Sequence, residues 1–170
     1  MHYKTCCFTG HRRLPPGEIP ALRKRLEEEI RRLYREDFHY FAAGGALGFD
    51  TLAALAVLSL RKELPGLRLI LVLPCLDQTR GWPPQDVGFY NFIKRRADKV
   101  VYTGQGYTPG CMHRRNRTLV EGSDCCLSYL THRSGGTFYT VEYCRKKGVP
   151  VINLVNWKFK FQSIHPKTGT

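Results

Sequence analysis

The stretch Gly44-Gly45-Ala46-Leu47-Gly48 follows a short apolar run and precedes a helix-like segment rich in alanine and leucine. A second glycine turn, Ser134-Gly135-Gly136-Thr137, also follows an apolar run and opens a helix-like stretch. Glycine lets backbone N–H groups approach a ligand closely, and the start of the following helix offers unpaired N–H groups and a positive dipole end. The two turns therefore predict sites for an anion, such as a phosphate, at the ends of strands.

Outward from these turns, strand-like and helix-like segments alternate along the chain. In the range 20–34, apolar residues recur every three or four positions, which predicts an amphipathic helix. The run 67–73 is apolar and stops at Pro74, which is typical of a strand covered on both faces of a parallel sheet. The other expected strands are 5–9, 39–43, 99–103, 125–130 and 149–154, and the other expected helices are 50–60, 86–97, 112–121 and 140–147. This order predicts an α/β fold, a doubly wound sandwich with a mainly parallel sheet of about six strands.

The composition is that of one globular domain. The chain has 170 residues, of which 42% are hydrophobic, and this is enough to form a core of its own. It contains neither an apolar run of about eighteen residues nor the apolar core of a signal peptide near its start, so we expect a cytoplasmic protein without a membrane partner. We expect the domain to span 1–155 and the basic segment 156–170 to form a peripheral tail.

Charge and cysteine content limit the partners. The net charge of +13 favours an anionic partner, either a nucleotide-like molecule or a nucleic acid. The seven cysteines include the adjacent pairs 6/7 and 125/126 in strand-like runs, where neighbouring side chains point to opposite faces, and we expect mostly buried thiols. Cys111 and His113 form the only close Cys/His pair, which is fewer ligands than a structural zinc requires. We therefore expect no metal, and no required cofactor besides a nucleotide-type ligand.

Unusual residues gather after the expected strands. In a doubly wound sheet, the loops after the carboxyl ends of the strands lie along one edge, and ligands bind where the strand order reverses. The predicted ligand-binding residues lie in these loops and at the helix starts: Gly10, His11, Arg12, Gly44, Gly45, Gly48, Asp50, Arg115, Asn116, Gly135, Gly136 and Thr137. Gln78, Arg80, Trp82 and Tyr107 also follow strands, and for Trp82 packing is favoured over stacking on a base.

Three of these residues have structural alternatives. His11 suits either a phosphate or ribose contact or an ordinary turn. Asp50 suits either a ribose hydroxyl or the N-cap of the helix that follows. Arg115 suits either ligand binding or a surface ion pair. The usual dinucleotide fingerprint and the P-loop lysine are both absent from the glycine turns, which disfavours hydride transfer and P-loop ATP hydrolysis.

Taken in order, five motifs resemble the SLOG superfamily and, within it, the YpsA-like branch of small bacterial proteins. They are Thr9-Gly10-His11-Arg12, the turn from Gly44 to Asp50, Leu73-Pro74-Cys75 with Trp82, Arg115-Asn116, and the Gly135-Gly136-Thr137 turn leading to Glu142. The resemblance covers about residues 5–154 and implies a Rossmann-like three-layer domain that binds nucleotide-derived ligands, for sensing or for cleavage.

The same superfamily contains the Lonely-guy phosphoribohydrolases, which cut nucleoside monophosphates at the N-glycosidic bond. Residues 112–116 are similar to their Met-His-x-Arg-Lys motif, with Asn116 in place of lysine. Residues 134–142 are similar to their Pro-Gly-Gly-x-Gly-Thr-x-x-Glu motif, with Ser134 in place of proline and with Phe138 and Tyr139 in place of glycine and threonine. The resemblance places Arg115 and Glu142 on catalytic positions, where arginine would hold the phosphate and the carboxylate would stabilise the oxocarbenium ion. It also implies a homodimer for Lonely-guy-like relatives and single-stranded DNA for relatives of the DprA/Smf type.

The sequence thus predicts a domain that binds a nucleoside phosphate, ADP-ribose or an NAD-like ligand as a sensor or regulator. The ligand phosphate is expected between the Gly44 and Gly135 turns, with Arg115 and Asn116 closing over it. N-glycosidase activity of the phosphoribohydrolase type is the first alternative, and sequence-independent binding of single-stranded DNA is the second.

Overall fold

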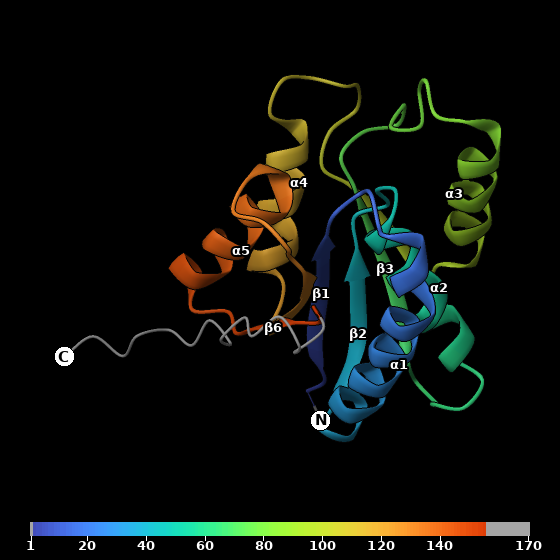
Figure 1. Cartoon of the computed structure of the whole chain (residues 1–170), viewed down its shortest axis with the longest axis vertical. Helices are drawn as coiled ribbons and strands as arrows, with labels where there is room; N and C mark the ends of the chain where they lie inside the picture. Colours follow the sequence, from blue (N-terminus) through green and yellow to red (C-terminus); the bar gives the residue numbers. More distant parts are fainter. Residues whose placement is uncertain (1, 156–170) are drawn as a thin grey trace.

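The computed structural model describes residues 2–155 (Figure 1), so the expected tail 156–170 lies outside the described residues. The strands are β1 (Lys4–Gly10), β2 (Phe38–Ala43), β3 (Arg68–Leu73), β4 (Lys99–Tyr102), β5 (Cys125–Tyr129) and β6 (Val151–Asn153). A short 3-10 helix, η1 (Pro16–Glu18), precedes α1 (Ile19–Arg35), and the other helices are α2 (Phe49–Leu60), α3 (Pro84–Arg96), α4 (Cys111–Glu121) and α5 (Gly135–Lys147).

The strands form one parallel sheet in the order β4-β3-β2-β1-β5-β6. The chain adds β2, β3 and β4 on one side of β1, and α4 then leads it back so that β5 pairs with the other side of β1. Helices α1, α2 and α3 pack side by side on one face of the sheet, and α4 packs with α5 on the other (Figure 1). The architecture is the Rossmann-like three-layer sandwich that the sequence predicts, and its strand order reverses between β1 and β5.

Two cores fill the space between the layers. The larger one joins the sheet to α1, α2 and α3 and includes Phe8, Phe41 and Phe49. The smaller one lies under α4 and α5 and is built from smaller side chains, among them Cys7 and Ala42. Because alternate residues of a strand face opposite sides, Cys7 and Phe8 belong to different cores.

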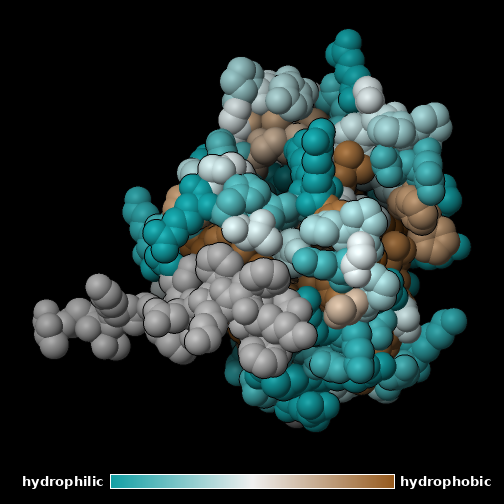
Figure 2. Space-filling view, in the orientation of Figure 1, coloured by the Kyte–Doolittle hydropathy of each residue, from teal (hydrophilic) through white to brown (hydrophobic). Residues whose placement is uncertain are grey.

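Helices α1 and α2 differ in how much of their surface is covered. Helix α1 buries one stripe, formed by Leu22, Leu26, Ile30 and Leu33, and keeps charged residues outside. Helix α2 is packed between its two neighbours and buries seven of its twelve residues, which explains why its sequence has almost no polar face. Between residues 2 and 155, no helix combines the length and the apolar character that a membrane crossing requires. Figure 2 shows hydrophilic side chains over most of the visible face, with apolar ones in the recesses between them.

Helix α5 begins earlier than the sequence predicts. Its expected start is residue 140, but the structure begins the helix at Gly135, directly after an extended Ser134. Because glycine has a low helix propensity, the sequence predicts a helix start that is too far toward the carboxyl end of the chain. The first N–H groups of a helix have no partner within it, so glycine is tolerated in the first turn when the following residues pack. Gly135 and Gly136 are thus the first turn of α5 itself.

Candidate functional site

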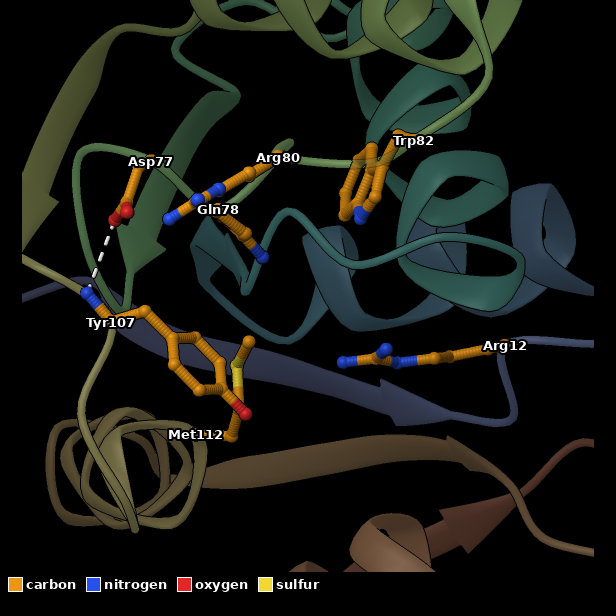
Figure 3. Close-up of a pocket in the computed structure, with 7 residues that line it drawn as sticks. All are labelled: Arg12, Asp77, Gln78, Arg80, Trp82, Tyr107 and Met112. Carbon is orange, nitrogen blue, oxygen red and sulfur yellow. Dashed lines mark hydrogen bonds between the residues drawn. The ribbon is translucent and has the colours of Figure 1, made fainter.

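A cavity of about 360 Å³ opens at the carboxyl edge of the sheet. Its walls come from the loops after β1, β3 and β4 and from the start of α4 (Figure 3). The lining residues are Arg12, Asp77, Gln78, Arg80, Trp82, Tyr107 and Met112. This is the edge at which the sequence predicts the site, and the loop after β3 supplies four of the seven lining residues.

The Gly44 carbonyl group anchors the base of this site. It accepts a hydrogen bond from Nη1 of Arg115 and another, of 3.2 Å, from Nε2 of Gln78. A Cβ atom on Gly44 would lie only 2.6 Å from the Arg115 guanidinium, so the close approach requires glycine. Arg115 is only 4% exposed, and its Nη2 lies 3.8 Å from the sulfur of Met112, which lines the cavity. Arg115 therefore supports the cavity through its contacts with Gly44 and Met112. The structure does not show the surface ion pair that the sequence allows as an alternative for this residue.

Asp50 lies inside the same loop. It is buried, and its Oδ2 accepts a hydrogen bond of 3.2 Å from the Ala46 N–H group. Burial raises the pKa of Asp50, while the nearby guanidinium groups of Arg115 and Arg12 and the Ala46 N–H oppose that shift. Gly48 occupies the N-cap position of α2, so Asp50 is not the N-cap that the sequence allows as an alternative. Its carboxylate instead fixes the shape of the glycine turn.

The Gly44 turn also packs against the loop after β1. Gly48 has a φ of 75°, and a Cβ atom on it would lie 2.1 Å from the carbonyl oxygen of Arg12. A Cβ atom on Gly10 would lie 2.3 Å from the Phe49 ring, and the Phe49 N–H donates to the His11 carbonyl at 3.1 Å. Both glycines are therefore required by the contact between two loops. That contact holds Arg12 at the mouth of the cavity.

Arg12 and Arg80 reach toward the cavity from separate loops (Figure 3). Within residues 2–155, neither guanidinium forms an ion pair with a carboxylate. Trp82 stands edge-on to Tyr90 at 5.7 Å, which fixes the indole at one wall. The packing favoured for Trp82 is thus present, and the ring also lines the cavity.

Tyr107 forms the opposite side and is 67% exposed. Its backbone N–H donates to Oδ1 of Asp77 at 3.1 Å (Figure 3), and the Leu76 N–H donates to the Gln105 carbonyl at 2.8 Å. These two bonds join the loops after β3 and β4. The exposed phenol ring consequently stands on a braced loop beside the cavity.

His11 connects the loops after β1 and β5. Its Nε2 accepts a hydrogen bond of 2.9 Å from the Thr131 N–H, and its ring stacks on His132 with 4.0 Å between centroids. Burial lowers the pKa of His11, and the nearby His132 lowers it further. Nε2 can accept this hydrogen bond only when the ring is neutral, and a lowered pKa favours the neutral ring. His11 thus connects the loops after the two strands between which the strand order reverses.

The second glycine turn is arranged differently. Gly135 and Gly136 are exposed, and a Cβ atom on either would meet nothing within 4 Å. Thr137 is buried, and Ser134 makes no side-chain cap. The first turn follows β2 and the second follows β5, and β1 lies between these two strands. The two turns therefore stand at the same edge of the sheet, separated by the width of one strand. The lining of the cavity includes residues over the first turn and none from the second.

Asn116 and Glu142 complete the predicted set. Oδ1 of Asn116 accepts a hydrogen bond of 2.7 Å from Nε of Arg115, so these neighbours form one unit. The Glu142 side chain is 44% exposed and pairs with Arg145 at 3.1 Å, one turn along α5. Neither Asn116 nor Glu142 lines the cavity.

The loop after β3 supplies lining residues that the glycine motifs do not predict. Of the seven lining residues, Arg12 alone is in the predicted ligand-binding set, although Gln78, Arg80, Trp82 and Tyr107 also follow expected strands. No motif in the sequence points to Asp77. The available signal was position, because each of these residues comes soon after a buried parallel strand.

Comparison with known proteins identifies the family of this chain. The family model described as YpsA, the YspA SLOG family, matches residues 8–150, which include the loop after β1, both glycine turns and all of α4. The chain belongs to this family. A UPF0398 protein of Bacillus thuringiensis (strain Al Hakam) is 30% identical over 136 residues, covering 78% of this chain and 73% of its own. This YpsA-family chain is thus similar to bacterial proteins along most of its length.

Two solved structures show the same fold. DNA processing protein A from Helicobacter pylori, described for its single-stranded DNA binding mode, superposes with a TM-score of 0.63 at 19% identity, over 87% of this chain and 63% of its own. DprA from Streptococcus pneumoniae gives a TM-score of 0.65 at 19% identity, over 88% of this chain and 49% of its own. The YpsA-family chain therefore spans about half to two thirds of these larger proteins, and the likeness concerns the fold.

Proposed function

We propose that this YpsA-family protein binds a nucleotide-derived small molecule, such as a nucleoside phosphate, ADP-ribose or an NAD-like ligand, as a sensor or regulator. The ligand occupies the cavity at the carboxyl edge of the sheet. The observation that carries this proposal is the convergence of Arg12 and Arg80, neither of which is ion-paired within residues 2–155, on a cavity walled by Trp82 and Tyr107.

The chemistry of the lining divides into two parts. Guanidinium groups bind phosphate oxygens with paired, charge-assisted hydrogen bonds, so Arg12 and Arg80 would bind the phosphate of the ligand. Aromatic rings offer flat faces to a nucleobase, so Trp82 and Tyr107 would stack on the base of the ligand. Asp77 is the one acidic residue of the lining, and it accepts the Tyr107 N–H. A lining with more cationic than acidic groups favours retention of an anion.

Arg115 and Asp50 have an indirect part in this proposal. Arg115 and Gln78 both bind the Gly44 carbonyl, and Asp50 holds the Ala46 N–H. A loop fixed in this way needs little ordering when a ligand arrives, which lowers the entropic cost of binding. These residues are positioning residues for the cavity, and Asn116 acts with them through Arg115.

The test is a thermal-shift screen followed by calorimetric titration with AMP, ADP-ribose, NAD and cyclic nucleotides. A ligand present at a hundred times its Kd stabilises the fold by about 2.7 kcal/mol. We expect Arg12→Ala and Arg80→Ala each to weaken binding at least about tenfold, the loss of one charge-assisted contact. The matched control is Arg68→Ala, because Arg68 begins β3 at the opposite edge of the sheet and, among residues 2–155, its one ion pair is the exposed contact with Asp98 at 3.4 Å.

Two results would contradict the proposal. Full binding in the Arg12→Ala and Arg80→Ala proteins would place the ligand elsewhere, and an equal loss in Arg68→Ala would show that general charge dominates. Release of free base from AMP, abolished by Glu142→Ala, would instead support the phosphoribohydrolase alternative. An assay for free base, run beside the binding titrations, therefore separates a sensor from an N-glycosidase.

Single-stranded DNA is a second candidate, and it is favoured by the exposed Tyr107 beside Arg12 and Arg80, which have no carboxylate partner in the part of the chain that the structure describes. Proteins that bind single strands combine a basic track with aromatic rings on which bases stack. Binding of an oligothymidylate should then weaken steeply with salt and be lost in Tyr107→Ala. Salt-insensitive or absent retention of the oligonucleotide, with AMP or ADP-ribose still bound, would leave the small-molecule function alone.

A further inference from the structure

Strands β1 and β5 carry two cysteine pairs in matched register. Cys6 lies opposite Cys125, and Cys7 lies opposite Cys126. Neighbouring strands are about 4.8 Å apart. This spacing falls within the roughly 4.4–6.8 Å between the Cα atoms of disulfide-bonded cysteines. All four are free thiols, so the sheet holds two candidate dithiols at the point where its order reverses.

The pairs lie on opposite faces of the sheet. Cys6 and Cys125 belong to the core under α1, α2 and α3, whereas Cys7 and Cys126 belong to the core under α4 and α5. The second pair is joined there by Cys144 of α5. The protein therefore contains two cysteine pairs with the same cross-strand register but with different surroundings.

Cys125 stands in the more reactive surroundings. It is the first residue of β5, at the amino edge of the sheet, and is 5% exposed. Interaction with the Cys6 thiol lowers the pKa of Cys125, and Arg32 of α1 lowers it further, although burial acts in the opposite direction. Burial, and then the interaction with Cys125, raise the pKa of Cys6. Because the thiolate is the nucleophile and Cys125 is also the more exposed of the two, Cys125 would be the attacking sulfur and Cys6 the resolving thiol.

The other pair lacks these features. Both Cys7 and Cys126 are fully buried, whereas in the first pair Cys6 is fully buried and Cys125 keeps a small exposed surface. Interactions with Cys144 and Cys7, together with burial, raise the pKa of Cys126 well above its usual value. Thiols buried in this way are inert toward soluble oxidants. The second pair is thus an internal control for the first.

We propose that Cys6 and Cys125 are an oxidisable dithiol that reacts with a hydroperoxide and closes to a disulfide between β1 and β5. The Cys125 thiolate attacks one peroxide oxygen, the O–O bond breaks, and the leaving hydroxide takes up a proton to become water. The Cys6 thiol then attacks the resulting sulfenic sulfur, the S–O bond breaks, and a second water leaves as the S–S bond forms. The two thiols lose two electrons and two protons in total, and hydrogen peroxide is reduced to two molecules of water.

The crosslink would join the two strands that lead into the Arg12 and Thr131 loops. Those loops are already held together by the His11 contact with the Thr131 N–H. A reversible bond at the other end of the same strands makes this part of the sheet a site of oxidative modification. The inference depends on β1 and β5 alone and does not require the proposed ligand.

The experiment exposes the native full chain to hydrogen peroxide, alkylates the remaining thiols and measures the intact mass. We expect the mass of two hydrogen atoms to be lost, two fewer alkylated cysteines, and reversal by dithiothreitol. Because Cys6 is adjacent to Cys7 in the sequence and Cys125 is adjacent to Cys126, double variants are needed to assign the bond. Cys7→Ala with Cys126→Ala should still form the crosslink, and Cys6→Ala with Cys125→Ala should not.

Several results would overturn the proposal. One is a native chain that keeps all seven thiols free at peroxide concentrations that oxidise a reference low-pKa dithiol. Another is a crosslink that forms only after unfolding in urea, or one that disappears in the Cys7→Ala, Cys126→Ala protein. If a double variant does not fold, fragmentation of the wild-type crosslinked peptide between Cys6 and Cys7 gives the same assignment.

Discussion

The two glycine turns have similar sequences and opposite surroundings. At the Gly44 turn, neighbouring groups fill the space beside the backbone, with a carbonyl oxygen 2.1 Å from a Cβ built on Gly48. At the Ser134 turn, Gly135 and Gly136 face open space. Glycine in the first turn is required by packing, whereas in the second Gly135 is favoured only by its φ of 84° and Gly136 leaves the helix start uncovered. Similar glycine motifs in one chain therefore serve different physical purposes.

This difference divides the site into a rigid part and an open part. The Gly44 turn, fixed by Arg115, Gln78 and Asp50, supports the cavity. The start of α5 presents exposed N–H groups at the positive end of the helix, one strand beyond β1. A ligand that contacts both turns would have to extend across the end of β1, which agrees with a nucleotide longer than a lone phosphate.

The largest contrast is expected from paired glycine substitutions. Gly48→Ala should lower the free energy of unfolding by about 3 kcal/mol or more, because the φ of 75° and the Arg12 carbonyl both oppose a Cβ atom. Gly136→Ala should be neutral or stabilise by up to about 1 kcal/mol, since the helix start has room for it. Urea denaturation of both proteins measures the difference. Equal destabilisation by the two substitutions would show that the two turns tolerate a Cβ atom equally poorly, which would contradict the difference proposed between them.

Arg115→Ala should give the next largest effect. It leaves the Gly44 carbonyl with only the Gln78 bond and leaves Asp50 without its nearest counter-charge, so we expect a loss of about 2–4 kcal/mol in unfolding free energy. Arg133→Ala, an exposed position in the loop before the second turn, is the control and should change stability by less than about 0.5 kcal/mol. A stable Arg115→Ala protein that only loses ligand binding would return Arg115 to the role of phosphate clamp.

Asp50 makes the rigid turn sensitive to pH. Because the folded state raises the pKa of Asp50 above 3.8, the folded protein binds this proton more tightly than the unfolded chain does. The contribution of Asp50 to stability is therefore greatest below 3.8 and falls as the pH rises through the shifted pKa. Asp50→Asn removes this dependence, so the variant should gain stability relative to wild type as the pH rises over that interval.

Asp98 provides a control with the opposite sign. Burial raises the pKa of Asp98, but the Leu69 N–H and Arg61 more than offset it, and the net shift is downward. Its contribution is present above 3.8 and is lost as the pH falls through the lowered pKa. Asp98→Asn should therefore lose stability relative to wild type as the pH rises. Parallel pH profiles for the two variants, measured by urea denaturation, would contradict the assignment of Asp50.

The smallest effect is expected at Glu142. Its side chain is 44% exposed and pairs only with Arg145 among the described residues, so Glu142→Gln should change stability by less than about 0.5 kcal/mol. Nucleotide affinity measured by calorimetry should also be unchanged. A large loss of affinity would place Glu142 beside the ligand and connect α5 to the cavity.

Much of the fold was predictable because its signals are local. The apolar run before Pro74 and the three- and four-residue spacing in α1 fix a parallel strand and an amphipathic helix. The start of α5 was wrong by five residues, since the helix propensity of glycine says nothing about the packing of the residues that follow. The cavity opens at the edge of the sheet where the sequence predicts the site, but most of its lining residues lie outside the predicted ligand-binding set.

The sequence by itself determined the alternation of strands and helices, the parallel sheet and the edge at which polar loops meet, because periodicity and chain connectivity are properties of short segments. Only the tertiary structure decided that Gly48 packs on Arg12, that Arg115 turns inward to Gly44, and that Arg80 and Tyr107 share a cavity. The physical reason is that these contacts join residues far apart in the chain. Their distances depend on strand order and layer packing, which no local pattern encodes.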